Sequence, residues 1–220
     1  DKEYMESLVS YNHALMQRNS LLKDEFVNDN SLFEVYEGKM GIEAEKIYFK
    51  RKAFIEEFTP VFEHYYRIIS GGKENISLSY SSHIDEGDLE NQLKKARQRD
   101  TLLGFTTRGI HKDDLQMDLD GFPVKRIGSQ GQNKSFLVAV KMAQYAFLKK
   151  ITGKNPILLI DDLFDKLDSC RVENIIKLVS GNDFGQIFIT DTNRKHLDEI
   201  LSQIGQSSQI FEIVNGEIIQ

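Results

Sequence analysis

Two adjacent carboxylates follow a short apolar run in the sequence Pro156-Ile-Leu-Leu-Ile-Asp161-Asp162. Such a run predicts a strand buried on both faces, and open α/β folds bind ligands where their strands end. Burying carboxylates is costly unless they are paired or bind a metal, and Mg²⁺ shared with substrate phosphates suits them. We therefore predict that Asp161 holds Mg²⁺ and that Asp162 orients or deprotonates an attacking water.

A glycine-containing loop, Gly128-Ser-Gln-Gly-Gln132, precedes an apolar stripe at helical spacing that runs from Phe136 to Phe147. Ser129 and Gln132 have the spacing of a capping box, which explains the start of a helix. A cap does not require Gly128 and Gly131, whereas glycines let a backbone approach a ligand closely, and the N-terminus of a helix attracts phosphate. The loop is therefore both a predicted cap and a candidate phosphate-binding surface.

Two other interpretations of the acids remain open. In the first interpretation, the acids are only turn and cap residues, and Asp168 is well suited to cap the helix that begins at Ser169. In the second they form a metal-dependent nuclease or phosphatase site, made of Asp161, Asp162, Asp165 and Asp168. Such a site gives the loop at 128–132 no function. It also predicts enzymatic activity in the absence of a nucleotide.

The elements around these motifs alternate between helix and strand. After the helix come a strand at 156–160, a helix with Val172, Ile175, Ile176 and Val179 inward, and a strand at 186–190. A further helix with Leu197, Ile200, Leu201 and Ile204 inward follows, and Asn215-Gly216 predicts a hairpin turn. The pattern predicts an α/β fold with a buried, partly parallel sheet.

The first part of the chain reads as helical to about Ser70, with a break near Gly38 and Gly41 and a kink or a new helix at Pro60. A strand is expected at 76–80 and a polar helix at 88–100, whose basic run Lys94, Lys95, Arg97 and Arg99 predicts a solvated face. Short extended pieces are expected around Thr106 and Val124.

Composition limits the class of protein. The 34 acidic and 28 basic residues leave a net charge of −6, which argues against a strongly basic nucleic-acid binder but allows a local basic face. The single cysteine, Cys170, cannot form an internal disulfide and favours a reducing compartment. Apolar runs are short and no secretory leader opens the chain, so we expect a cytoplasmic location and no membrane span.

The order of motifs resembles that of ABC-type ATPases: Gly-Ser-Gln-Gly-Gln as signature loop, the apolar strand with Asp161-Asp162 as Walker B, and Phe164-Asp-Lys-Leu-Asp168 as D-loop. The chain further resembles the RecF family of recombinational-repair ATPases over essentially its whole length. That family's "YNxxLxQRNxLLK" is found at 11–23, its "GPHRDDL" at 109–115 as Gly-Ile-His-Lys-Asp-Asp-Leu, and its "GSQGQ" intact at 128–132.

The resemblance implies a bacterial DNA-repair ATPase with an ABC/SMC-like P-loop head and a helical lever arm. Residues 1–100 would be the mainly helical arm, and 101–220 the C-terminal part of the head. In such a homodimer two heads clamp ATP and Mg²⁺ between them. Ser129, Gln130, Gly131 and Gln132 would contact the partner subunit's nucleotide, and Asp168 would take part in nucleotide binding. The dimer would bind gapped or double-stranded DNA and work with recombination-mediator proteins.

Three segments depart from the family or ABC patterns. Ile110 and Lys112 replace a proline and an arginine, so His111 and Asp113 receive no firm chemistry, and a structural role is expected for this histidine. Thr190-Asp191-Thr192 stands where many ABC enzymes have a switch histidine. Asp162 replaces the usual glutamate, and its shorter reach predicts slow hydrolysis.

A phosphate loop of the form G-x-x-x-x-G-K-[ST] is missing, because none of the Gly-Lys pairs at 38, 72 and 153 fits it. We expect that loop on an upstream segment, and we expect these 220 residues alone neither to bind ATP tightly nor to hydrolyse it. The alternative from another class is a non-catalytic interaction module, made of a helical arm and an incomplete α/β lobe. A strand followed by the phosphate-loop motif upstream would decide for the ATPase.

Overall fold

The computed structural model describes residues 1–24, 30–162, 166–181, 183–191 and 209–219. The chain packs into two compact units. Unit 1 comprises Asp1–Pro60 and Ser77–Asp118, and unit 2 comprises Val61–Ile76 and Leu119–Gln220. The division into an arm at 1–100 and a head portion at 101–220 concerns function and stays a prediction.

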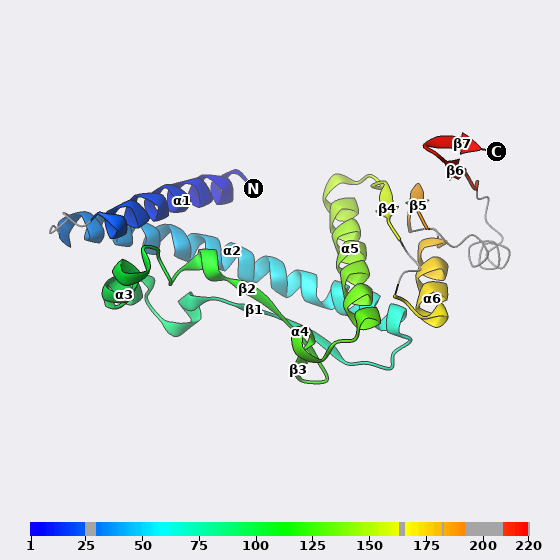
Figure 1. Cartoon of the computed structure of the whole chain (residues 1–220), viewed down its shortest axis with the longest axis horizontal. Coiled ribbons are helices and arrows are strands. Elements are labelled where there is room, and N and C mark those ends of the chain that lie inside the picture. Colours follow the sequence, from blue (N-terminus) through cyan, green and yellow to red (C-terminus); the bar gives the residue numbers. More distant parts are fainter. Residues whose placement is uncertain (25–29, 163–165, 182, 192–208, 220) are drawn as a thin grey trace. The chain divides into compact units, whose positions relative to one another are not determined.

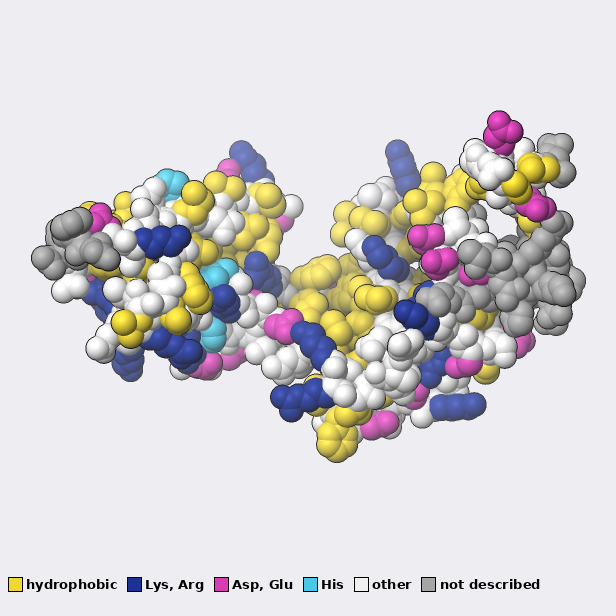
Figure 2. Space-filling model, viewed as in Figure 1, with side chains coloured by type: hydrophobic (Ala, Val, Ile, Leu, Met, Phe, Trp, Pro, Cys, Tyr) yellow, Lys and Arg dark blue, Asp and Glu magenta, His cyan; other side chains and the backbone are white. Residues whose placement is uncertain are grey.

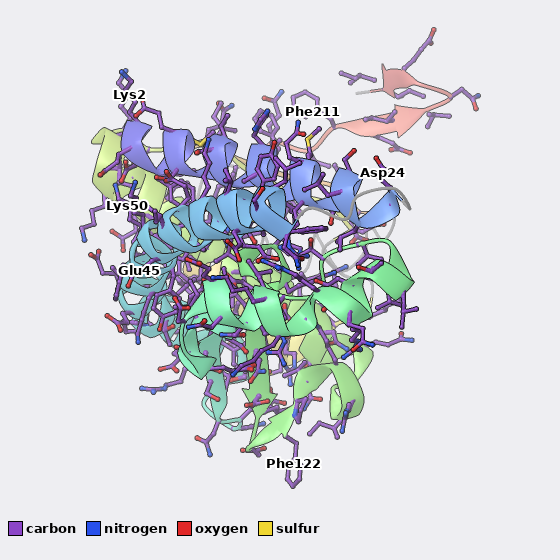
Figure 3. All side chains as sticks on the ribbon, turned by 90° about the vertical axis from the view of Figure 1, so that its left-hand side faces the viewer. Lys2, Asp24, Glu45, Lys50, Phe122 and Phe211 are labelled. Atoms are coloured by element: carbon purple, nitrogen blue, oxygen red, sulfur yellow. The ribbon has the colours of Figure 1, made fainter. Side chains whose placement is uncertain are left out.

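Unit 1 begins with two long antiparallel helices, α1 (Lys2–Lys23) and the part of α2 (Asn30–Ser70) up to Pro60. Lys50 of α2 donates hydrogen bonds to the carboxylates of Asp1 and Glu3, at 2.8 and 2.6 Å. Figure 3 shows Lys50 at the same end of the pair as Lys2. The prediction of a helical first part is confirmed.

The predicted break near Gly38 and Gly41 is wrong, because α2 runs through both glycines and also through Pro60. Glycine weakens a helix by about 1 kcal/mol relative to alanine, which tertiary packing easily offsets. The buried side chains of Glu37, Met40 and Ala44 surround the two glycines in the sequence and supply that packing.

The rest of unit 1 contains β1 (Ile76–Ser81), the 3₁₀ turn η1 (His83–Glu86), α3 (Leu89–Leu103), the 3₁₀ turn η2 (Ile110–Lys112) and most of β2 (Asp114–Leu119). The predicted strand at 76–80 and polar helix at 88–100 are confirmed. No strand forms at Thr106, where the structure has a loop, and the strand of this region is β2 instead. One core holds the unit together. Its buried residues come from α1, α2, α3 and η2: Tyr11, Ala14, Met40, Ala44, Ile47, Leu89, Leu93 and Ile110.

Unit 2 contains the last turns of α2, the short strand β3 (Phe122–Pro123), α4 (Val124–Ile127), α5 (Gln130–Thr152), β4 (Leu158–Ile160), α6 (Ser169–Val179) and β5 (Ile187–Ile189). Val124 therefore begins a short helix, not an extended piece. β4 and β5 pair in parallel, with Leu158 opposite Ile187 and Ile160 opposite Ile189. The predicted alternation of helices with parallel strands is confirmed (Figure 1).

The core of unit 2 forms between α5, α6 and the end of α2. The rings of Phe62 and Phe136 lie 4.7 Å apart, and so do those of Tyr145 and Phe184. The four residues predicted to face inward from α6 are all buried, namely Val172, Ile175, Ile176 and Val179. Helical periodicity therefore identified this face correctly.

The prediction that the strand at 156–160 is buried on both faces is wrong for the described structure. Leu158 is buried, whereas Leu159 is 70% exposed and Ile157 61% exposed. The sheet has two strands, so successive side chains point to a covered and an open face in turn. Figure 2 shows hydrophobic side chains on the surface around α5 and β4.

A hairpin of β6 (Glu212–Val214) and β7 (Glu217–Ile219) ends the described structure. Asn215 and Gly216 connect the strands with positive φ values of 54° and 85°, which confirms the predicted turn. None of the described helices is long and apolar enough to cross a membrane.

Candidate functional site

The loop at 128–132 starts α5 with the predicted capping box. Ser129 Oγ accepts a hydrogen bond from the backbone N–H of Gln132 at 3.2 Å, and Gln132 Oε1 accepts one from the N–H of Ser129 at 2.8 Å. The side chains of Ser129 and Gln130 remain exposed. The cap therefore fixes the first turn of α5 and leaves two polar side chains facing solvent.

Both glycines of the loop lie against the chain's own backbone. A Cβ on Gly128 would meet the carbonyl oxygen of Val124 at 2.7 Å, and one on Gly131 would meet that of Lys166 at 3.0 Å. Gly131 thus lets the segment that follows the acids approach the first turn of α5. Close packing within the unit accounts for the glycines without a ligand.

The two acids follow β4 directly, and both are exposed. The hydroxyl of Thr190, next to β5, donates a hydrogen bond to the carboxylate of Asp161, and the N–H of Asp162 donates one to Thr190 Oγ1 at 3.4 Å. Asp162 adopts a left-handed conformation with φ 50°, and Lys134 of α5 donates to its carbonyl oxygen. Neighbouring strands and α5 therefore fix the turn that carries the acids.

An open pocket of about 570 Å³ lies between the first turns of α5 and the end of β4. Its lining includes Gln130, Lys134, Lys141, Leu159, Asp161 and Lys166. Figure 2 shows acidic and basic side chains close together on this part of the surface. The structure thus brings Gln130 and Asp161, predicted separately from two motifs, to one pocket, whose lining is otherwise mostly apolar.

The residues present fit a magnesium ion shared with phosphates. Asp161 offers an exposed carboxylate beside the Thr190 hydroxyl, and Mg²⁺ takes one or two carboxylates while keeping water and phosphate ligands. Among the described residues, no three His, Cys, Asp or Glu side chains are grouped to hold a metal by themselves. That finding gives no support to the four-aspartate site, of which Asp165 lies outside the described residues.

Arg171, near the start of α6, joins the N-terminal parts of α5 and α6. Its guanidinium donates hydrogen bonds to Glu74 at 2.6 Å, to the hydroxyl of Ser135 on α5 at 2.8 Å, and to Asp168 at 3.0 Å. Sequence reasoning missed both Arg171 and Glu74. No motif pointed to Glu74, which follows the Gly71-Gly72 turn as one more polar residue.

The carboxylate of Glu74 accepts hydrogen bonds from three side chains. Besides Arg171, these are the hydroxyl of Tyr66 at 2.6 Å and the side-chain amide of Gln132 at 2.9 Å. Burial alone would raise the pKa of Glu74, but the three hydrogen bonds lower it below its ordinary value. Gln132 is thereby committed within its own chain, to Glu74 and to the N–H of Ser129.

Asp168 caps α6 as predicted, since its carboxylate accepts the N–H of Arg171 at 2.9 Å. That backbone hydrogen bond is the main reason why its pKa lies below the ordinary value. The side chain is 60% exposed and remains open to solvent. Its predicted role in nucleotide binding stays a prediction.

The segment at 109–115 forms a separate cluster in unit 1. His111 Nδ1 lies 2.9 Å from the hydroxyl of Tyr11, and its Nε2 lies 3.1 Å from the carbonyl oxygen of Thr106. A carbonyl accepts only, so Nε2 carries the proton and Nδ1 of a neutral ring accepts from Tyr11. The structural role expected for His111 agrees with this arrangement.

Asp113 in the same segment is an anchor for α2. Its carboxylate accepts from Arg51 at 2.7 Å and from the hydroxyl of Tyr80, while Arg51 also donates to the carbonyl oxygen of Ile110 at 2.9 Å. The Asp113 side chain is 5% exposed. The cluster therefore fastens η2 to the helices of unit 1.

We expect His111 to make this segment sensitive to acid. Burial lowers its pKa, helped by Lys112 and His83 and opposed by the hydrogen bond to Thr106 and by Asp113. As pH falls below about 6.5, the unfolded histidine gains a proton that the folded one resists, so stability is lost. Hydrogen exchange of amides 104–113, corrected for intrinsic rates, should show more opening at pH 5.5 than at pH 7.5.

His111→Gln should flatten that pH dependence, because glutamine can donate and accept without titrating in this range. His13→Gln, at an exposed position of α1, is the matched control and should leave it unchanged. A pH dependence that survives in His111→Gln would contradict the assignment.

The chain matches curated bacterial proteins along almost its entire length. It is 54% identical over 218 residues to the DNA replication and repair protein RecF of Bacteroides thetaiotaomicron, covering 99% of this chain and 59% of that protein. For RecF of Parabacteroides distasonis the identity is 53%, with 99% and 60% covered. The chain belongs to the RecF family. It spans about 60% of the length of these relatives.

A solved structure shows the same fold. The recombination mediator protein RecF with ATP, described as part of the RecFOR pathway, matches with a TM-score of 0.74 at 24% identity. The match covers 100% of this chain and 58% of that one. No family model matches the chain. The described mixed α/β fold is therefore that of part of a RecF protein.

The structure describes two of the RecF-type motifs on long helices, whereas some of the other predicted segments lie outside the described residues. The "GSQGQ" loop lies at the N-terminus of a long helix, and the "YNxxLxQRNxLLK" segment forms most of α1. Thr192 and the predicted helix containing Leu197 to Ile204 lie outside the described residues. Thr190, in place of a switch histidine, bonds to Asp161 and so belongs to the turn of the acids.

Proposed function

We propose that the chain is part of an ABC/SMC-like ATPase that acts as an ATP-dependent DNA clamp in recombinational and replication-gap repair. Its relatives are named DNA replication and repair proteins, and the solved structure of like fold is a recombination mediator with ATP. In this proposal unit 1 is the core of a helical lever arm, and unit 2 is the C-terminal portion of a head whose phosphate loop lies on another segment.

The observation that carries the proposal is the exposed first turn of α5. The capping box holds the loop rigidly, while Ser129 and Gln130 face solvent at a helix N-terminus, where partial positive charge favours phosphate. A rigid anion-binding turn on the surface suits a nucleotide brought by a second copy. Gln132 then acts by holding the turn, since its side chain is already bonded within the chain.

The acids have complementary tasks in the proposed head. Asp161 would hold Mg²⁺ that neutralises phosphate charge, and Asp162 would orient or deprotonate the attacking water. Asp168 would contact the partner's nucleotide from the start of α6. Because aspartate reaches less far than glutamate, we expect hydrolysis to be slow, which suits a clamp that stays closed on gapped or double-stranded DNA until mediator proteins act.

Ser129→Arg is expected to spare ATP binding by the monomer of the full-length protein and to block its ATP-bound dimer. The bulky cation occupies the surface that the partner's nucleotide must reach. Light scattering with a non-hydrolysable ATP analogue measures the dimer directly, and an intact dimer would refute the role in trans.

A matched pair of variants at position 129 separates the effect of charge from the effect of helix capping. Aspartate and asparagine cap helices about as well as serine, so both variants should keep α5 in place. Ser129→Asp adds a negative charge beside phosphates and should also prevent the dimer, whereas Ser129→Asn should retain it. A dimer that forms equally well in both variants would show that phosphate does not approach this turn.

A further inference from the structure

Each predicted nucleotide-contacting loop of unit 2 has its own cap, but a cap fixes a loop only to its own helix. Ser129 and Gln132 cap α5, and Asp168 caps α6. The relation between the two loops depends on contacts that cross from one helix to the other. Those contacts converge on Arg171 and Glu74.

Two paths lead from Arg171 to the α5 loop. In the first, its guanidinium donates to Ser135 Oγ at 2.8 Å, and that hydroxyl donates to the carbonyl oxygen of Gly131 at 2.8 Å. In the second, Glu74 accepts from Arg171 at 2.6 Å and from the Gln132 amide at 2.9 Å. The Nε of Arg171 donates a hydrogen bond to the carboxylate of Asp168 at 3.0 Å.

The pair is shielded enough to hold this geometry. The side chain of Arg171 is 14% exposed and that of Glu74 is 13% exposed. Hydrogen bonds between charged groups are stronger than neutral ones, and the planar guanidinium fixes the directions of its donors. Burial also raises the pKa of Tyr66, and its bond to Glu74 adds to this, so the tyrosine stays a neutral donor to the carboxylate.

We propose that Arg171 and Glu74 are positioning residues, which hold the loop at 129–132 and the Asp168 turn as one rigid surface for the partner's nucleotide. The proposal rests on the proposed function, because it assumes that both loops meet that nucleotide. Neither residue touches the nucleotide itself. Losing Arg171 should leave each cap in place and release one loop from the other, whereas losing Glu74 should remove one of the two paths and loosen them.

The test uses the full-length protein and three readings: ATP affinity of the monomer, ATP-driven dimerisation, and hydrogen exchange of the loops. For Arg171→Ala we expect dimerisation to weaken by on the order of 10- to 100-fold, and for Glu74→Ala by less, because a loop released from its neighbour must be ordered again when the nucleotide binds. Monomer ATP affinity should change by less than about twofold. Exchange should rise at 129–135 and 168–171 together.

Two milder variants keep the test decisive if alanine disturbs folding. Glu74→Gln retains an oxygen that can accept from Gln132 and Tyr66, but it removes the negative charge. Arg171→Lys retains the positive charge but loses the planar set of guanidinium donors. Both should weaken dimerisation by an intermediate amount. Lys177→Ala, which removes an exposed ion pair with Glu173 on the same helix, is the control and should behave like the wild type.

The outcomes separate this proposal from the one it rests on. If the unaltered protein does not dimerise with ATP, the proposed function fails. If it dimerises and the Arg171 and Glu74 variants do so equally well, only the positioning role is wrong. A parallel loss of monomer ATP affinity and of exchange protection throughout unit 2 would show a general structural role and would also overturn it.

Discussion

Arg18→Met is expected to destabilise unit 1 by about 3–5 kcal/mol, because it leaves the buried carboxylate of Asp100 without its cation and removes one of the two guanidinium groups that bind buried Glu37. The side chains of Arg18, Glu37 and Asp100 are all 0% exposed. Hydrogen exchange of peptides from α1 and α3 should report this loss as faster opening of both helices.

The size of the effect follows from how completely Arg18 is satisfied. Its guanidinium donates to Glu37 at 3.0 Å, to Asp100 at 2.7 Å, to the Thr106 hydroxyl at 2.8 Å and to the carbonyl oxygen of Leu93 at 3.1 Å. Methionine fills much of the volume but supplies no donor. Asp100 then keeps the N–H and hydroxyl of Thr107 as donors, but it loses its charged partner without regaining water.

Arg99→Met is the matched control, since Arg99 is exposed on α3 and its replacement should change stability by no more than about 0.5 kcal/mol. Adding Asp100→Asn to Arg18→Met should recover part of the loss, because a neutral amide costs less to bury than an unpaired carboxylate. Equal exchange in Arg18→Met and the wild type would contradict a stabilising role for the network.

Gly109→Ala should have the second largest effect, a loss of about 3 kcal/mol or more from backbone strain and steric overlap together. Gly109 has φ 131° and ψ 177°, a region that is open to glycine almost alone. A Cβ there would lie 2.2 Å from the hydroxyl oxygen of Tyr11. The variant must therefore displace either Tyr11 or η2, and hydrogen exchange of amides 104–113 should show it.

Gly87→Ala isolates the backbone contribution. Gly87 has a similar conformation, φ 120° and ψ −163°, but a Cβ there meets no heavy atom within 4 Å. Its replacement should cost about 1–3 kcal/mol, from strain alone. Combining Gly109→Ala with Tyr11→Phe should relieve part of the overlap. If the two glycine variants were equally destabilised, the contact with Tyr11 would be unimportant.

Local signals in the sequence identified many of the helices and strands and the family, although they wrongly predicted a break in α2 and an extended piece at Val124. Helical periodicity located α5 and the buried face of α6, the serine and glutamine at 129 and 132 predicted their own capping box, and Asn215-Gly216 predicted its turn. Each depends on residues close together in the chain, so that neighbouring side chains decide the conformation. The "GSQGQ" and Asp-Asp motifs are likewise continuous stretches of sequence, so they can be recognised without a structure.

Contacts between distant segments were decided by the tertiary structure alone. Arg97 belongs to a charge run that predicts a solvated face, yet it donates to Glu37 at 2.6 Å, a residue sixty positions away. The sequence pattern of a charged helix is the same whether its partner is water or a buried carboxylate. Only the packing of α3 against α2 separates the two cases.

The candidate site shows the same division. The sequence by itself determined which residues carry carboxylates, hydroxyls and glycines, and in which order. The tertiary structure placed Gln130 and Asp161 at one pocket, turned the Gln132 side chain toward Glu74, and joined the caps of α5 and α6 through Arg171. The physical reason is that a helix cap is specified within four residues, whereas the separation of two caps depends on how their helices pack.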